Sequence, residues 1–386
     1  MARAMAWDRR PLQTRMVYLG GLIGPFASQS LVAVVPEFAA TFDKPVQHAS
    51  LAVTAYMITL ASTMLFSSAL VRNVPPHVVV RTAYAFTAAG AALCWVAPSW
   101  NGFIAGIVVM ALSNAFTLPI LQLMLRQLVS PEELGQALGR YFAMQSLGNC
   151  VGPLGAGLVS IANWQLIHLL VIALAGAMVL VGVPPVAPIR RERVDEPVAW
   201  SPMIVHIFTI LALGAGIIGM GTVLIIHLDS AFGMPASQRG LVIMVGGLVA
   251  FFVSPRIGSS VDKFGALTIM TVCAVAGAGT IAAIPHLPWP VAIAVFWAVA
   301  VSCAQGIQTT VTYSVLRTPG GAALNSSILA FRFFGLALTP LVLLPVYLRS
   351  AWAGFALPAV LLMAALGLQW AQPGMRATLR PALKAE

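Results

Sequence analysis

The chain has 386 residues, of which 59% are hydrophobic and only 8% are charged. A soluble domain carries about 25% charged residues, so this composition excludes a soluble globular protein and requires a surface that faces lipid. The net charge of +10 is not concentrated in a basic run interleaved with aromatic residues, which argues against a nucleic-acid partner.

Membrane-spanning helices are the elements that the hydropathy pattern predicts. A helix needs roughly 20 apolar residues to cross the hydrocarbon core of a bilayer. The apolar runs are long and continuous, whereas a β-barrel would need short alternating segments. In chain order, we expect twelve spans, over residues 16–36, 49–71, 82–98, 103–125, 139–160, 165–185, 202–226, 239–255, 267–285, 290–314, 323–347 and 351–371.

The distribution of basic residues predicts the orientation of these spans. If both termini are cytoplasmic, the outer loops hold only Lys44, Arg239 and Arg349. Every other basic residue except Arg332 then lies in an inner segment, which is the positive-inside pattern. The first fifteen residues form a basic flank, and the run after them is long enough to span, so we expect no cleavable signal peptide. We therefore expect a multi-pass protein of the inner (cytoplasmic) membrane.

The longest polar interruption, APIRRERVDEPVAWS, separates the first six predicted helices from the last six. It predicts an N-terminal six-helix bundle over residues 1–185, a cytoplasmic central loop over 186–201 and a C-terminal six-helix bundle over 202–386.

The fifth predicted helix contains an unusual glycine-rich stretch, GNCVGPLGAG. Small residues let helix backbones approach closely in lipid, and a proline kinks the helix. Ordinary helix packing would account for a lone glycine pair. The full spacing resembles the glycine–proline signature of the drug:proton antiporters of the major facilitator superfamily. The residues that carry this resemblance are Gly148, Gly152, Pro153, Gly155 and Gly157.

A second motif follows the eighth predicted helix, in the loop GSSVDKFGALTIM. It resembles the loop signature of the same superfamily, matched by Gly258, Asp262, Lys263 and Gly265. The acid of this motif can sit at a helix N-terminus or pair with an arginine, and it usually serves as a conformational latch. In the first half of the chain the equivalent position is Arg72, so that copy departs from the pattern.

The resemblance implies an all-α integral membrane protein with twelve helices in two pseudo-symmetric bundles. It also implies a secondary transporter that works by alternating access, acts as a monomer and needs no cofactor. The sequence has no HExxH, no GxSxG and no intramembrane aspartate pair, so we expect no enzyme activity. The four cysteines lack CxxC spacing and are expected to be packing residues rather than metal ligands.

Arg332 is the leading candidate for substrate binding, because a charge at membrane depth is costly. It lies roughly 13 Å into the eleventh predicted helix, at 1.5 Å per residue. Its guanidinium could hold an anionic or carbonyl-bearing substrate by charge-assisted hydrogen bonds. Alternatively, it could extend to the cytoplasmic lipid headgroups or bond a neighbouring helix. The other substrate candidates are neutral polar side chains in the middle of predicted helices. Each could contact the substrate, or it could instead make a hydrogen bond to a neighbouring helix. These residues are Gln29, Asn114, Gln305, Gln145 and Asn149.

Three further residues are candidates for carrying a proton. Glu37 and Asp229 lie toward equivalent ends of the first helix of each half, where burial would move a carboxylate toward protonation near neutral pH. Glu37 has an alternative as a solvated helix cap. His227 could pair with Asp229 and titrate near physiological pH.

The predicted helices lack a central carboxylate, so the cavity is expected to be neutral to positive. The resemblance of the glycine–proline helix implies proton-coupled export, and the missing acid favours a neutral or anionic small organic molecule as the substrate. The alternative is an importer or facilitator of a small organic anion or metabolite with the same fold, which the missing central acid and Arg332 favour. A non-transporting membrane protein is the third reading.

Overall fold

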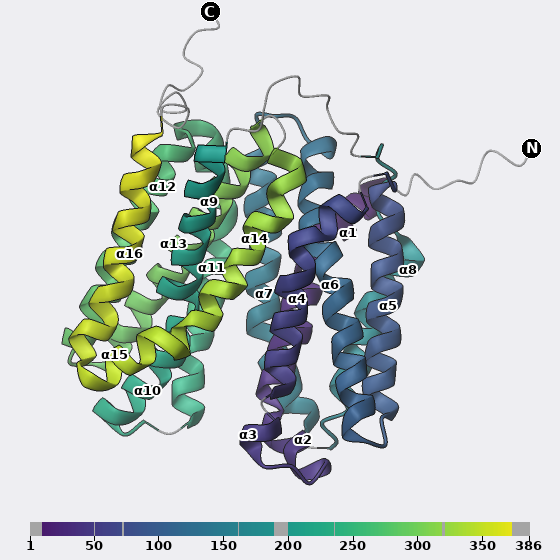
Figure 1. The fold of residues 1–386 in the computed structure, drawn as a ribbon, viewed down its shortest axis with the longest axis horizontal. Helices are drawn as coiled ribbons and strands as arrows, with labels where there is room; N and C mark the ends of the chain where they lie inside the picture. Colours follow the sequence, from purple (N-terminus) through teal and green to yellow (C-terminus); the bar gives the residue numbers. More distant parts are fainter. Residues whose placement is uncertain are drawn as a thin grey trace, which may run out of the picture. The chain divides into compact units, whose positions relative to one another are not determined.

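The computed structural model describes residues 10–49, 51–71, 73–160, 162–188, 200–234, 236–318 and 321–372. Within these ranges all regular secondary structure is helical, and no strand is present (Figure 1). The helices before the central loop are α1 (Arg10–Ala33), α2 (Val35–Thr41), α3 (Val46–Ala49), α4 (Leu51–Leu70), α5 (Pro76–Val96), α6 (Trp100–Leu128), α7 (Leu134–Ser160) and α8 (Leu166–Val181).

The helices after the central loop include two π-helical turns, η1 and η3. They are α9 (Trp200–Leu213), η1 (Gly214–Ile218), α10 (Met220–Phe232), α11 (Ala236–Phe264), α12 (Ala266–Ala283), η2 (Ile284–His286), α13 (Pro290–Arg317), α14 (Gly321–Leu338), η3 (Thr339–Leu343), α15 (Leu344–Arg349) and α16 (Ala351–Ala371).

Helices of the described structure cover most of each of the twelve predicted ranges, which agrees with the predicted all-α fold. The seventh span is formed by α9, η1 and α10, and the eleventh by α14, η3 and α15, because a π-helical turn interrupts each. In the described part of the chain, eight helices are long and apolar enough to cross a membrane, and three apolar helices are shorter.

The end of the eighth span was predicted incorrectly. The helix continues past 255 to Phe264, so the motif from Gly258 to Lys263 lies in the last turns of α11 rather than in a loop. Only Gly265 leaves the helix, with φ 85°. A positive φ is accessible to glycine at little cost, and glycine commonly ends helices in this way. Pro255 lies inside α11 without ending it.

The chain divides into two compact units. The first comprises 1–128 and 147–191, and the second comprises 129–146 and 192–386. The boundary thus falls inside α7, whose N-terminal part belongs to the second unit and whose C-terminal part belongs to the first. The predicted bundle limits of 1–185 and 202–386 stay a prediction.

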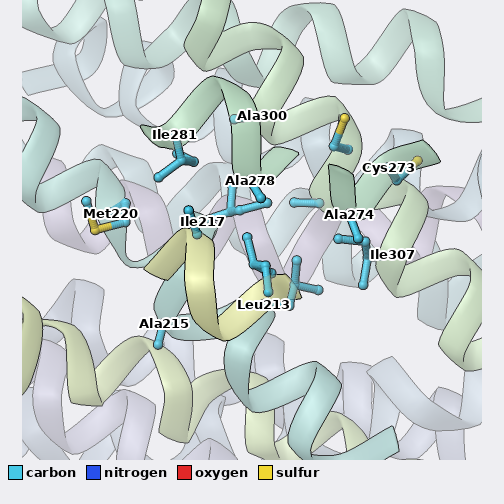
Figure 2. Close-up of a cluster of buried hydrophobic side chains, with 14 of the residues drawn as sticks. Leu213, Ala215, Ile217, Met220, Cys273, Ala274, Ala278, Ile281, Ala300 and Ile307 are labelled. Atoms are coloured by element: carbon cyan, nitrogen blue, oxygen red, sulfur yellow. The ribbon is translucent and has the colours of Figure 1, made fainter. Parts of the chain in front are cut away.

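Each unit has its own buried core. In the second unit, apolar side chains of α9, η1, α12 and α13 interdigitate, among them Leu213, Ile217, Ala278 and Ile307 (Figure 2). In the first unit, aromatic rings gather at one end: the Phe38 and Phe103 centroids are 5.2 Å apart, and Trp164 donates from Nε1 to Thr41 Oγ1 at 2.8 Å. Polar side chains are buried beside these apolar cores, among them Gln308 in the second unit and Asn114 in the first.

Candidate substrate site and conformational contacts

The second unit contains a partly buried guanidinium in the middle of a helix bundle. Arg332 of α14 donates from Nη1 to Gln308 Oε1 of α13 at 2.5 Å. Its Cζ lies 4.8 Å from the centroid of the Phe333 ring, and Tyr141 is within electrostatic range. Among the described residues, no carboxylate lies within 4.0 Å of Arg332. The positive charge is therefore held by neutral groups, although a buried cation is normally paired with an anion.

Polar side chains of α13 share one face near this guanidinium. Gln305, Gln308 and Thr312 are spaced so that they follow the same side of the helix, and all three are buried. Gln305 Oε1 and Thr312 Oγ1 have no hydrogen-bond partner in the described structure. Buried polar atoms without partners are rare in folded proteins, so they mark places where a ligand or water can bind.

The N-terminal part of α7 contributes a second polar face to the same unit. Tyr141 and Gln145 are buried, one turn apart, and share a side-chain hydrogen bond. Gln145 Oε1 and the neighbouring Ser146 Oγ have no partner in the described part of the chain. Two hydrogen-bonded polar pairs, Gln145 with Tyr141 and Arg332 with Gln308, therefore lie within electrostatic range of each other. They offer one cation, amide oxygens that accept hydrogen bonds and hydroxyls that donate them.

The first unit holds a smaller and uncharged polar pair. Asn114 of α6 donates from Nδ2 to Tyr56 Oη of α4 at 2.6 Å, and both side chains are buried. Asn114 Oδ1 has no hydrogen-bond partner among the described residues and lies beside Gly24 of α1. Gln29 is half-buried and Asn149 is exposed, and neither belongs to this pair.

Sequence reasoning did not select three of these side chains for the site: Tyr56, Tyr141 and Gln308. Two of them had a signal in the sequence. Tyr141 lies four residues before Gln145, and Gln308 lies three residues after Gln305, so each shares a helix face with a residue that was selected. Tyr56 could be named from the sequence only as an aromatic that could line a pocket, and its hydrogen bond to Asn114 could not be predicted because the two residues are on different helices.

The proton-carrier candidates lie in different surroundings. Glu37 is half-buried in α2, and its Oε2 is buried without a hydrogen-bond partner in the described structure. His227 of α10 is buried, with Nδ1 3.3 Å from Tyr347 Oη and its ring centroid 5.4 Å from that of Phe355. The side chain of Asp229 lies outside the described residues, so its predicted pairing with His227 stays a prediction.

The glycine–proline motif packs α7 against α1 within the first unit. A Cβ at Gly148 would overlap the carbonyl oxygen of Leu22, and one at Gly152 would lie 2.8 Å from that of Phe26. Ser30 Oγ donates to the carbonyl of Gly152 at 3.0 Å. Only glycine permits so close an approach of two helix backbones.

The other residues of this motif take smaller parts in the contact. A Cβ at Gly155 would make an ordinary contact of 3.5 Å with the Phe26 ring, and Pro153 lies within the helix without ending it. Gly157 lies outside the residues whose surroundings are described.

A second glycine face on α7 was missed by sequence reasoning. Gly135 and Gly139, in the sequence LGQALGR, pack against α11 in the second unit. A Cβ at Gly139 would lie 2.5 Å from the carbonyl oxygen of Ser254, and one at Gly258 would overlap that of Gly135. Their spacing of four residues is the small-xxx-small pattern that signals close helix packing in membranes.

Asp262 binds the N-terminus of α7. Its Oδ1 accepts from the N–H of Gly135 at 2.9 Å, and its Oδ2 accepts from the N–H of Gln136 at 2.8 Å. The first four N–H groups of a helix have no partner within the helix, and its N-terminus carries partial positive charge. Arg317 is within electrostatic range of the same carboxylate. Lys263 is exposed, with Nζ 5.1 Å from the centroid of the Phe264 ring.

An analogous close approach joins α14 to α9 and η1 in the second unit. A Cβ at Gly214 would overlap the backbone carbonyl of Arg332, and one at Gly335 would overlap that of Leu211. Thr339 Oγ1 lies 3.3 Å from the carbonyl of Ala215, to which it donates. The backbone that carries Arg332 is thus fixed by glycine contacts.

Helices that are long and apolar enough to cross a membrane, with buried polar side chains among them, define an integral membrane protein. The family model described as Major Facilitator Superfamily matches residues 17–340, and the chain belongs to this superfamily. Its members are transporters and not enzymes.

The comparison with solved structures gives the same fold. The crystal structure of the human organic anion transporter MFSD10 (TETRAN) is similar to this chain with a TM-score of 0.76 and 16% sequence identity. The match covers 94% of this chain and 99% of that one. Among curated protein sequences, none matches this chain significantly.

Proposed function

We propose that this chain is a secondary transporter of the inner membrane that exports a small organic molecule, anionic or neutral, by proton-coupled alternating access. The observation that carries the proposal is the guanidinium of Arg332, held by Gln308 with no carboxylate beside it in the described structure. A cation in this position attracts an anion by charge-assisted hydrogen bonds. The printed name of the similar structure, an organic anion transporter, supports the same substrate class.

In this proposal each polar side chain of the second unit has a role. Arg332 binds the anionic or carbonyl oxygen of the substrate. Gln305 and Gln145 accept hydrogen bonds from it through the amide oxygens that have no partner in the described structure. Asn114, Gln29 and Asn149 of the first unit stay predicted substrate contacts, of which Asn114 has a buried amide oxygen without a partner among the described residues.

Export as the direction rests on the resemblance of the glycine–proline motif to that of drug:proton antiporters, and the close packing of α7 on α1 is compatible with it. The Gly148–Gly152 face keeps α7 tightly packed on α1, which closes the path for leak along this pair of helices. The cap that Asp262 places on α7 acts as a conformational latch, because its two hydrogen bonds must break if α11 and the start of α7 separate. Glu37, Asp229 and His227 are the proposed proton carriers.

The experiment that tests the proposal is accumulation of labelled cationic, neutral and anionic compounds in efflux-deficient cells. Vector, wild type, Arg332→Ala and Arg332→Lys are compared, each with and without a protonophore. We expect wild type to lower the accumulation of an anionic or neutral compound, and the protonophore to abolish the effect. Arg332→Ala is expected to lose anion export, and Arg332→Lys, which keeps the charge, to retain part of it.

Other outcomes would redirect the proposal. If wild type raises accumulation, the protein is an importer or facilitator, and the glycine–proline motif serves packing alone. If a protonophore changes nothing, export is not driven by the proton gradient. Efficient export of a lipophilic cation that does not depend on Glu37 or Asp229 would contradict the predicted substrate charge.

A further inference from the structure

A cavity of about 240 Å³ in the second unit is distinct from the polar side chains around Arg332. It lies between the start of α7 and the later part of α11, and its walls are almost entirely apolar. The residues that line it are Arg140, Ala143, Met144, Phe251, Phe252 and Pro255. The side chain of Phe252 is 59% exposed, so the cavity opens outward as a groove on the surface of this unit.

One charged side chain borders this apolar groove. Arg140 is exposed, and no hydrogen bond or ion pair to it is found among the described residues. A second guanidinium follows the groove on α11: Arg256 lies one turn after Phe252 and donates from Nη1 to its carbonyl oxygen at 3.0 Å. An apolar floor with cations at its edge is complementary to a molecule that has an acyl chain and an anionic headgroup.

The membrane position of the groove identifies the source of such a molecule. The positive-inside distribution puts the start of α7 and the end of α11 on the cytoplasmic side. The lipids of the cytoplasmic leaflet include anionic phospholipids, and basic pockets between helices on this side bind their headgroups. An arginine near the hydrocarbon boundary also gains from a phosphate partner, because an unpaired charge at that depth is costly.

We propose that this groove is a binding site for an anionic phospholipid of the cytoplasmic leaflet. Arg140 binds the phosphate, Arg256 adds a second positive charge, and one acyl chain lies over Phe251, Phe252 and Met144. The occupied groove holds the start of α7 against α11, beside the Asp262 cap. The proposal does not depend on the substrate or the direction of transport.

Lipid retention by the purified full-length protein tests this site. Phosphatidylglycerol and phosphatidylcholine with identical acyl chains are titrated in detergent, and bound lipid is counted by native mass spectrometry. The variants are Arg140→Gln, Arg140→Lys and, as the matched control, Arg81→Gln, which removes another exposed arginine of the cytoplasmic side in α5. Melting temperature is recorded for each variant with and without lipid.

We expect tighter retention of phosphatidylglycerol than of phosphatidylcholine by wild type. Arg140→Gln should lower its affinity about fivefold, the ratio expected for one basic residue near an anionic headgroup, whereas Arg140→Lys and Arg81→Gln should stay near wild type. Equal retention of the two lipids, or equal loss in Arg140→Gln and Arg81→Gln, would overturn the proposal. Displacement of the lipid by equimolar glycerol 3-phosphate would show a site for a soluble anion instead.

Discussion

The two units build one type of helix contact in two different ways. In the first unit, the fifth helix of its half, α7, packs through glycines on the first, α1. In the second unit, the fifth helix of its half, α14, packs through glycines on α9 and η1. In the first pair, Pro25 and Pro153 lie inside continuous α-helices. In the second pair, the π-helical turns η1 and η3 interrupt the helices, and η3 itself contains Pro340.

This difference coincides with a difference in chemistry. Near the first pair, the buried polar groups are neutral, with Asn114 bonded to Tyr56. At the second pair, the contact glycine Gly214 lies against the backbone carbonyl of Arg332 itself. π-helical turns are rare and occur frequently at functional sites. The comparison therefore suggests that both contacts hold two helices close together, and that the second also positions a charged group.

Substituting the contact glycines should have the largest effect. Gly148→Val and Gly214→Val place a side chain against a backbone carbonyl that cannot move aside, so each should destabilise the protein by about 3 kcal/mol or more. Gly176→Val and Gly279→Val are matched controls, since nothing lies within 4 Å of a Cβ at either position. Thermal melting in detergent measures the effect. Equal melting of the contact and control variants would show that neither contact is tight.

Removing one polar group from each unit should affect the affinities for anionic and neutral compounds differently. Arg332→Gln loses a charge-assisted interaction of about 1.5–3 kcal/mol, so the affinity for an anion should fall roughly tenfold to a hundredfold. Asn114→Ala loses a neutral hydrogen bond worth about 0.5–1.5 kcal/mol, so its loss should be up to about tenfold and should not depend on substrate charge. Competition binding of matched anionic and neutral compounds measures both ratios. An equal loss for both compounds in Arg332→Gln would contradict the assignment.

The cap on α7 should make a smaller contribution. Asp262→Asn keeps one oxygen acceptor but removes the charge that faces the helix N-terminus, so we expect a loss of about 1 kcal/mol in the free energy of unfolding. Lys263→Gln, at the exposed neighbouring residue, is the control and should be near neutral. In the first half the equivalent position is Arg72, so no acidic cap of this kind is expected there. An unchanged melting temperature in Asp262→Asn would remove the latch from the proposed mechanism.

The smallest effect is expected at the hydroxyls that bridge each helix pair. Ser30 donates to the carbonyl of Gly152, and Thr339 donates to that of Ala215. Ser30→Ala and Thr339→Val should each cost about 0.6 kcal/mol, the average for such bonds in a bilayer. Melting of the single variants checks this value. A much larger loss for Thr339→Val alone would show that the contact of α14 and η3 with η1 depends on its hydrogen bond more than the contact of α7 with α1 does.

The sequence by itself determined that the protein lies in a membrane and where its helices run. Apolar length and the positions of arginines are local properties of the chain, so the multi-pass helical fold and the approximate helix ranges could be predicted from them. The glycine–proline spacing of α7 likewise identified a helix face that packs closely, before its partner was known.

Only the tertiary structure decided which side chains meet. Gln308 of another helix accepts a hydrogen bond from Arg332, and Tyr141 of a third helix lies within electrostatic range of it. Asp262 accepts from the N–H of Gly135, 127 residues away along the chain. The extension of α11 past Pro255 was not predicted for a related reason. In a membrane, a helix can continue past a proline because neighbouring helices and side chains can satisfy the backbone groups that the proline leaves free. Contacts between helices depend on how the helices cross, and hydropathy along one helix carries no information about that.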